Sequence, residues 1–155
     1  MGFKEYVKNC VIIDMGAKFM KKNKKCFAVL TGGGDCSGLN AALRGVVKTL
    51  LNNGCVVYGV YNGFNGLVND NIYQMSYADV QRILSLGGTI LGTTNRDNPF
   101  HMADQKNGKI EFVDKRDLVL SNLAKYKIDA LIVIGGDGTL AIGAKLAKEC
   151  GINVV

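Results

Sequence analysis

Two apolar segments of this chain each run directly into a cluster of glycines, and this pattern restricts the possible folds more than any other feature. Residues 26–30 (CFAVL) lead into Thr31 and three glycines, and residues 129–134 (DALIVI) lead into two more. A short apolar run bounded by glycines is typical of a buried strand that ends in a loop. Continuously apolar strands fit a parallel sheet that is covered on both faces.

Helical and strand patterns alternate along the rest of the chain. The other predicted strands are residues 56–61 and 152–155, and the predicted helices are residues 43–51, 118–124 and 140–149. A helix capped by Ser76 is expected over 76–86, and loops over 62–66 and 93–109. Alternating strands and helices predict an α/β fold, a three-layer Rossmann-like parallel sheet with flanking helices. Because the chain stops within a strand pattern, we expect it to be truncated before a second domain.

Charge divides the chain into a basic leader, residues 1–25, and a nearly neutral body, residues 26–155. The chain has a net charge of +6, and the leader holds seven lysines against Glu5 and Asp14. The body is expected to be the N-terminal part of one nucleotide-binding domain, and the leader an extension. A nucleic-acid-binding protein usually spreads its basic residues over a face, so we expect no nucleic-acid partner.

Other sequence features argue against several classes of protein. The five cysteines are odd in number and contain no C-x-x-C pair, which predicts free thiols in a reducing, cytoplasmic compartment and no zinc site. His101 is the only histidine, so a two-histidine metal site is excluded. No apolar run approaches the 18 or so residues of a membrane span, so we expect no membrane association.

The loop after the first strand has the composition of a phosphate-binding turn. Glycines at 32–34 let the backbone approach an anion closely, and backbone N–H groups before a helix attract one. The loop lacks the G-K-[ST] ending of a P-loop, and a tight turn without a ligand remains an alternative.

A second candidate loop follows residues 129–134. There Asp137 stands between Gly136 and Gly138 at the expected start of a helix, where its carboxylate would suit Mg²⁺ bound to phosphates. Thr139 would either contact a phosphate or cap the helix. Arg96 follows another glycine-threonine segment and would suit a transferring phosphoryl group, although a surface arginine is the alternative.

Four segments together resemble the 6-phosphofructokinase family. They are GGDCSGLNA at 33–41, GVYNGFNGL at 59–67, GGTILGT at 87–93 and GGDGT at 135–139. Their order and spacing match the N-terminal, nucleotide-binding part of that family, from about residue 26 to the end. NAD kinases and diacylglycerol kinases resemble only the segment around 135–139.

The resemblance implies transfer of a phosphoryl group from Mg-ATP to the 1-hydroxyl of fructose 6-phosphate, in glycolysis. It assigns Gly34 to the donor phosphates, Tyr61 to the nucleotide base and ribose, and Arg96 to the donor and the transferring group. The nucleotide loop, with Asp137 as the magnesium partner, would consist of Gly136, Asp137, Gly138 and Thr139. Glycine at 138 favours ATP, whereas many pyrophosphate-dependent relatives have aspartate there. The family also forms homo-oligomers.

Three departures from the family pattern qualify this expectation. The family's catalytic base lies in a Thr-Ile-Asp-Asn-Asp segment expected after Val155, so the chain is expected to supply a donor site and to be inactive alone. The alternatives are a pyrophosphate-dependent enzyme and an incomplete nucleotide-binding fragment.

The second departure is that the segment around Arg96 is longer than in the best-known bacterial enzymes. The family's effector site uses several arginines, and Arg44 matches one of them. Two others are replaced here, by Lys48 and Asn71, and this loss of arginines implies weak or no allostery.

Overall fold

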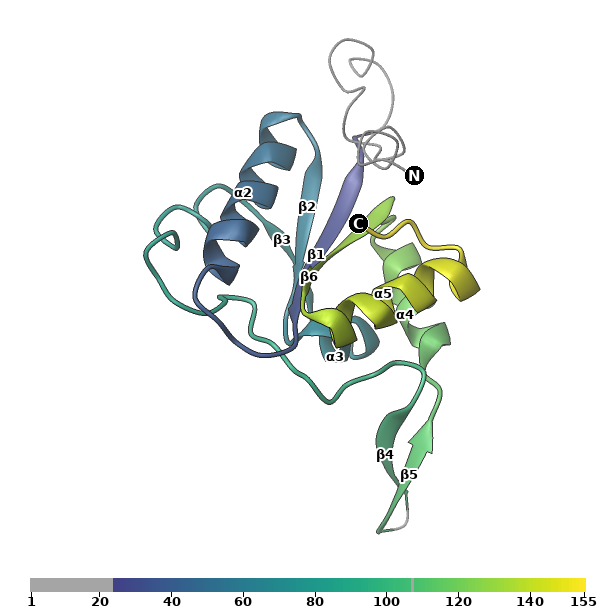
Figure 1. Ribbon diagram of the computed structural model, residues 1–155. Helices are drawn as coiled ribbons and strands as arrows, with labels where there is room; N and C mark the ends of the chain where they lie inside the picture. The colour runs from purple at the N-terminus through teal and green to yellow at the C-terminus, as the bar shows by residue number, and fades with distance from the viewer. Residues whose placement is uncertain (1–23, 107) are drawn as a thin grey trace, which may run out of the picture.

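The computed structural model describes residues 24–106 and 108–155, and a four-stranded sheet lies at its centre (Figure 1). The sheet has the order β3-β2-β1-β6. Its strands are β1 (Cys26–Gly32), β2 (Val56–Val60), β3 (Ile72–Met75) and β6 (Ala130–Gly135). The two strands that flank β1 run parallel to it, which confirms the parallel arrangement of the predicted apolar strands.

Helices cover both faces of this sheet and give the predicted three layers (Figure 1). The helices are α2 (Leu39–Asn52), α3 (Gly63–Val68), α4 (Arg116–Lys125) and α5 (Asp137–Cys150). On one face, Leu43 and Val47 of α2 pack with Val29 of β1. On the other, the helices α3, α4 and α5 share a second core cluster that contains Leu30 and Leu146. Alternate residues of β1 therefore serve opposite cores, as expected for a strand buried on both faces.

The edge strand β3 runs antiparallel to β2, so the sheet is mixed, which the prediction of a parallel sheet missed. The connection between the two strands, residues 61–71, contains the six-residue helix α3 and short turns on either side of it. A parallel crossover needs about a dozen residues or more, so this short connection returns the chain in the opposite direction. The same helix replaces the loop predicted over 62–66.

The prediction of a helix capped by Ser76 over residues 76–86 is wrong, because these residues form successive turns and bends. The Asp79 carboxylate accepts hydrogen bonds from both the N–H and the hydroxyl of Ser76, at 2.7 Å each. Arg44 of α2 donates to the carbonyls of Val80 and Gln81, which a continuing helix would use internally. Side chains therefore satisfy the backbone groups of this segment without a helix.

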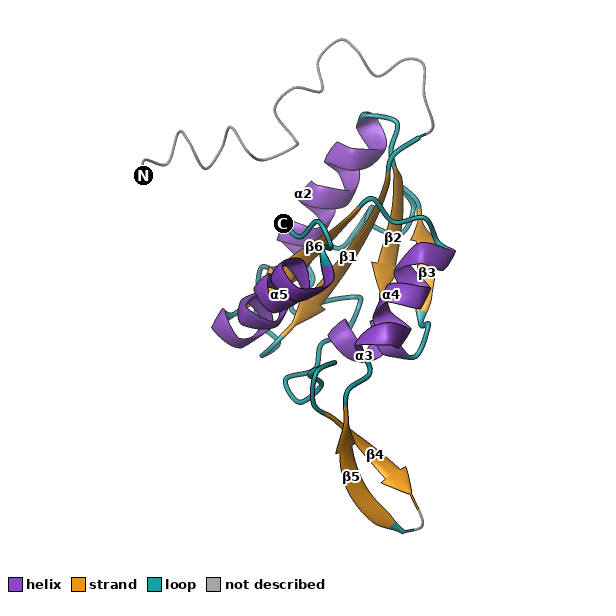
Figure 2. Ribbon diagram, turned by 90° about the vertical axis from the view of Figure 1, so that its right-hand side faces the viewer, coloured by secondary structure: helices purple, strands orange, loops and turns teal. Residues whose placement is uncertain are grey.

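Part of the surface loop predicted over 93–109 is instead a β-hairpin that projects from the body (Figure 2). Strands β4 (Met102–Lys106) and β5 (Lys109–Val113) pair antiparallel from Met102↔Val113 to Lys106↔Lys109. The overlooked signal is the Asn-Gly dipeptide at 107–108, the residue pair that two-residue hairpin turns favour.

Both ends of the described chain lie near β6, one against the strand itself and one against Asp129, the residue before it. Val154 forms a parallel bridge to Leu131, which is less than the strand predicted over 152–155. At the other end Lys25 pairs with Asp129 at 3.0 Å, and the Cys26 N–H donates to the same carboxylate. Burial raises the pKa of Asp129, but these hydrogen bonds outweigh it and leave the pKa lowered. The predicted basic leader otherwise lies outside the described residues.

Candidate functional site

The two glycine loops predicted to form one site lie side by side, because β1 and β6 are neighbours in register. Gly32 at the end of β1 is paired with Gly135 at the end of β6. The first loop, residues 33–38, and the nucleotide loop, residues 135–139, therefore leave the same edge of the sheet. Ligands of α/β folds bind beyond this carboxyl edge.

Thr139 fills the space between the ends of these two strands. A Cβ added to Gly32 would lie 2.6 Å from the Thr139 methyl group, and one added to Gly135 would lie 2.5 Å from the Gly32 carbonyl oxygen. Both contacts are shorter than carbon atoms tolerate, so glycine is required at both positions. Thr139 is only 7% exposed, and the residue at the N-cap of α5 is Gly136, so Thr139 does not cap the helix. The capping alternative is therefore wrong.

Segment 87–94 is joined directly to the first loop. The Gly33 N–H donates to the Thr94 carbonyl at 3.0 Å, and the Thr93 hydroxyl donates to the Gly33 carbonyl at 2.7 Å. Arg96 lies two residues beyond Thr94, and its own N–H donates to the Thr94 hydroxyl at 3.3 Å. The arginine is exposed, next to the first loop. The structure thus brings Arg96 and Gly34 to the same edge of the sheet.

Asn40 holds the start of segment 87–94 against helix α2, a role that the sequence pattern did not reveal. Its side-chain N–H groups donate to the carbonyls of Leu86 and Gly87, and its carbonyl accepts from the Ile90 N–H at 2.8 Å. Its backbone N–H also donates to the Gly88 carbonyl. At 2% exposure this amide is almost fully buried. The signal available in the sequence is an asparagine next to Leu39, at the start of an apolar helix face.

The second motif contributes Tyr61, which directly follows β2. Its ring stacks on the ring of Tyr73, with centroids 4.8 Å apart. Burial is the main cause that raises the pKa of Tyr73, and the neighbouring Tyr61 raises it further. The Asn62 N–H donates to the Leu91 carbonyl, which joins this motif to segment 87–94. Strand β1 separates β2 from β6, so Tyr61 lies about 10 Å from the nucleotide loop, two strand spacings away.

Asp137 is the first residue of α5 and is exposed, as its predicted role requires. No atom lies within 4 Å of a Cβ added to Gly136 or Gly138, so the space on both sides of the carboxylate is open. No cluster of three potential metal-ligating side chains exists among the described residues. Mg²⁺ is commonly held by one or two carboxylates together with substrate phosphates, so a single open carboxylate fits a magnesium ion that arrives with a nucleotide.

Free backbone N–H groups make α5 the better of the two helix starts for an anion. The first N–H groups of any helix lack partners within it, and their dipoles favour negative charge. In α2 the Asn40 N–H is already bound to the Gly88 carbonyl. In α5 the first internal bond is from the Leu140 N–H to the Gly136 carbonyl, and the N–H groups of residues 137–139 precede it. This arrangement suits the phosphates of a nucleotide.

Comparison with known sequences shows similarity to phosphofructokinases. The family model for phosphofructokinase matches residues 26–155. ATP-dependent 6-phosphofructokinase 2 of Clostridium perfringens is 44% identical over 133 residues, and ATP-dependent 6-phosphofructokinase 3 of Bacteroides thetaiotaomicron is 41% identical over 128 residues. These alignments cover 84% and 82% of this chain and 36% of each relative. The chain therefore spans about a third of the length of these curated relatives.

Solved structures show the same similarity. The T-state phosphofructokinase of Pichia pastoris superimposes with a TM-score of 0.70 and 36% identity, covering 87% of this chain and 14% of that one. A pyrophosphate-dependent phosphofructokinase of Marinobacter aquaeolei gives a TM-score of 0.65 at 18% identity, covering 84% of this chain and 31% of that one. The second match shows the fold alone and does not bear on the phosphoryl donor.

Proposed function

The chain belongs to the phosphofructokinase family, and from that premise we propose that it forms the donor site for phosphoryl transfer from Mg-ATP to the 1-hydroxyl of fructose 6-phosphate. The observation that carries the proposal is the convergence of the first loop, segment 87–94 and the nucleotide loop at one edge of the sheet. A nucleotide there would meet backbone N–H groups, an exposed carboxylate and an arginine.

Each site residue has a role that its position supports. Gly34, which is exposed and has no atom within 4 Å of an added Cβ, leaves room for the donor phosphates. Arg96 would place its guanidinium against the transferring group, whose negative charge spreads over the equatorial oxygens during transfer. Tyr61, at the end of β2, would face the base and ribose.

The nucleotide loop would hold the metal-bound phosphates. Asp137 would bind Mg²⁺, which neutralises phosphate charge when bound. The Gly138 and Thr139 N–H groups would bind phosphate oxygens at the helix start. Because the Thr139 methyl group fills the space beside Gly32, this threonine also holds the loop at a fixed distance from β1.

ATP is the donor that the site favours over pyrophosphate. The position after Asp137 is glycine, and the space next to it is open, so an α-phosphate could lie there. Both of the curated relatives described above are named ATP-dependent.

For the whole protein we propose a cytoplasmic, glycolytic kinase that acts as a homo-oligomer, without nucleic-acid or membrane partners. Among the described residues, no helix is long and apolar enough to cross a membrane.

A catalytically incomplete nucleotide-binding fragment is the second candidate, because the chain spans 36% of its curated relatives. Titration calorimetry with Mg-ATP tests the donor site itself. Phosphorylation of fructose 6-phosphate by the protein in its full natural length then tests the activity. Absence of Mg-ATP binding to a folded sample would contradict the proposed donor site. Binding without transfer would favour the fragment alternative.

A further inference from the structure

The segment that carries Arg96, residues 94–100, is attached to the body at both ends. At its start, the Thr94 carbonyl accepts the Gly33 N–H, as described above. At its end, the carbonyl of the buried Pro99 accepts the Lys115 N–H at 2.7 Å. That second bond ties the segment to the residue that follows the hairpin. A third contact joins the segment to α5, whose first residue is Asp137.

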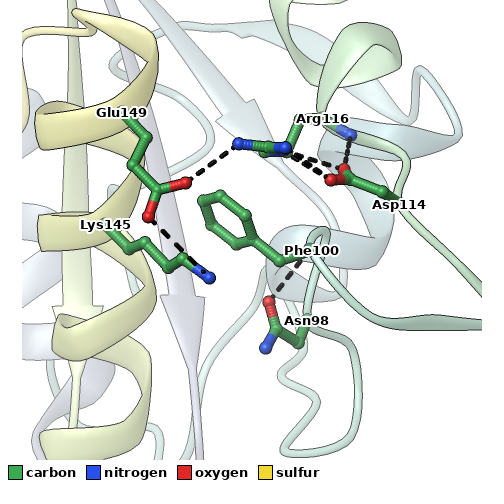
Figure 3. Close-up of polar contacts among 6 residues, drawn as sticks. All are labelled: Asn98, Phe100, Asp114, Arg116, Lys145 and Glu149. Carbon is green, nitrogen blue, oxygen red and sulfur yellow. Dashed lines mark hydrogen bonds and ion pairs between the residues drawn. The ribbon is translucent and has the colours of Figure 1, made fainter.

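The ring of Phe100 makes this contact, and it lies between two cationic side chains (Figure 3). The Lys145 ammonium of α5 lies 4.1 Å from the ring centroid, and the Arg116 guanidinium of α4 lies 4.9 Å from it. Both distances are within the range of cation–π attraction. Phe100 is half-buried and also packs against the core cluster that contains Leu146 of α5.

The two cations are themselves held in place. Arg116 pairs with Asp114 at 2.7 Å and with Glu149 of α5 at 2.9 Å, and Lys145 lies 3.9 Å from the same glutamate. Glu149 thus joins both cations, as Figure 3 shows. Hydrogen bonding from Arg116 lowers the pKa of Asp114, so this carboxylate stays charged at neutral pH. The ring therefore lies between two cations that are each paired with a carboxylate.

We propose that Phe100 is a positioning residue that holds Arg96 at a fixed place over the donor site, through its seat between Arg116 and Lys145. The proposal rests on the proposed function, in which Arg96 contacts the transferring group. The segment is bonded to the first loop at Thr94, and Phe100 contacts α5, the helix that begins in the nucleotide loop. Arg96, between them, is therefore positioned relative to both donor loops at once.

The physical reason is that transition-state stabilisation by a charge depends steeply on its position. Misplacement of a group by about 1 Å can lower a rate by about a hundredfold. With leucine at position 100, the segment would keep its attachments at Thr94 and Pro99 but lose the cation–π contact with Lys145 of α5. Arg96 would then sample several positions, and the maximal rate would fall more than substrate binding.

The test is a double-mutant cycle between Phe100 and Arg96 in the protein at its full natural length, with Mg-ATP and fructose 6-phosphate. F100L retains an apolar side chain and avoids the folding risk of F100A. We expect F100L to lower kcat about tenfold while changing the KM for ATP less than about threefold. In the R96A background, F100L should change kcat less than about twofold, because the group that it positions is gone. Equal effects in both backgrounds, or an unchanged kcat in F100L, would overturn the proposal.

A matched control and a second readout separate this proposal from the proposed function. Tyr126 also contacts a cation, with the Lys125 ammonium 5.1 Å from its ring, but it packs on Tyr58. Y126A should leave kcat within about twofold of wild type. If the wild-type protein transfers no phosphate to fructose 6-phosphate, the proposed function fails, and hydrogen exchange then decides whether Phe100 positions the segment.

The hydrogen-exchange readout needs no catalysis. The amides of Arg96 and Phe100 donate hydrogen bonds within the segment, to the Thr94 hydroxyl and the Asn98 side chain. They should exchange at least about fivefold faster in F100L than in wild type or Y126A, because the segment opens more often. Unchanged exchange would show that Phe100 does not hold the segment, whatever the activity of the protein.

Discussion

Replacement of Gly138 by aspartate tests the preference for ATP without disturbing the fold. Gly138 is exposed at the second position of α5, its φ is not positive, and no atom lies within 4 Å of an added Cβ. A larger side chain therefore fits. An aspartate near the start of a helix should stabilise it by about 0.3–1 kcal/mol through the helix dipole. We therefore expect the melting temperature of G138D to equal or exceed that of wild type.

Binding of Mg-ATP should change in the opposite direction. A carboxylate about 5 Å from the α-phosphate repels it by about 3 kcal/mol at an effective dielectric constant near 20. Bound Mg²⁺ offsets part of this repulsion, so we expect a loss of about 2–3 kcal/mol, or about 30- to 150-fold in Kd. Titration calorimetry measures the Kd, and thermal unfolding of the same sample measures the stability.

The isosteric variant G138N separates charge from volume, since asparagine has nearly the same size without the charge. It should weaken Mg-ATP binding by less than about tenfold. A folded G138D sample that binds Mg-ATP within about threefold of wild type would refute the reasoning, because no α-phosphate would then lie at this position. If G138N lost as much affinity as G138D, the repulsion would be steric rather than electrostatic.

Three further predictions concern stability. G135A should lower the free energy of unfolding by about 1–3 kcal/mol in urea melts, because the new Cβ would lie 2.5 Å from the Gly32 carbonyl oxygen; an unchanged midpoint would contradict this. N40A should cost about 1–3 kcal/mol and raise proteolytic cleavage around residue 88, because it leaves part-buried backbone groups without partners; equal stability would show that water replaces the amide. The lowered pKa of Asp129 adds stability that is complete above its ordinary value of 3.8 and is lost as the pH falls through the folded-state pKa. D129N should therefore flatten the dependence of the melting temperature on pH below about pH 4. A wild-type slope in D129N would place the effect elsewhere.

Sequence reasoning predicted the part of the fold that rests on apolar patterns. Strands β1 and β6 were readable because each is continuously apolar and ends in glycines, and this also placed their two loops at one edge of the sheet. Helix α3 was missed because its sequence, GFNGLV, contains two glycines. Gly66 is required there by packing, since an added Cβ would overlap the Tyr61 carbonyl, and tertiary contacts override its low helix propensity.

The positions of the candidate loops in the fold were predictable, whereas the residues that support these loops were not. The loops that carry Gly34 and Asp137 follow from motifs, and the structure brings both to the same edge. The amide of Asn40 and the ring of Phe100 act through partners distant in sequence, such as Ile90 and Lys145. No local pattern encodes such contacts, because each partner is ordinary in its own segment.

The contact of Thr139 with Gly32 and Gly135 has a consequence for the evolution of this family. The three positions share one small volume between two strand ends, so the size of each side chain limits the size of the other two. A homologue with a larger residue at position 32 should compensate with a smaller or differently shaped one at position 139. An alignment of relatives should therefore show these positions covarying as a unit, although position 32 lies about a hundred residues from the other two in the chain.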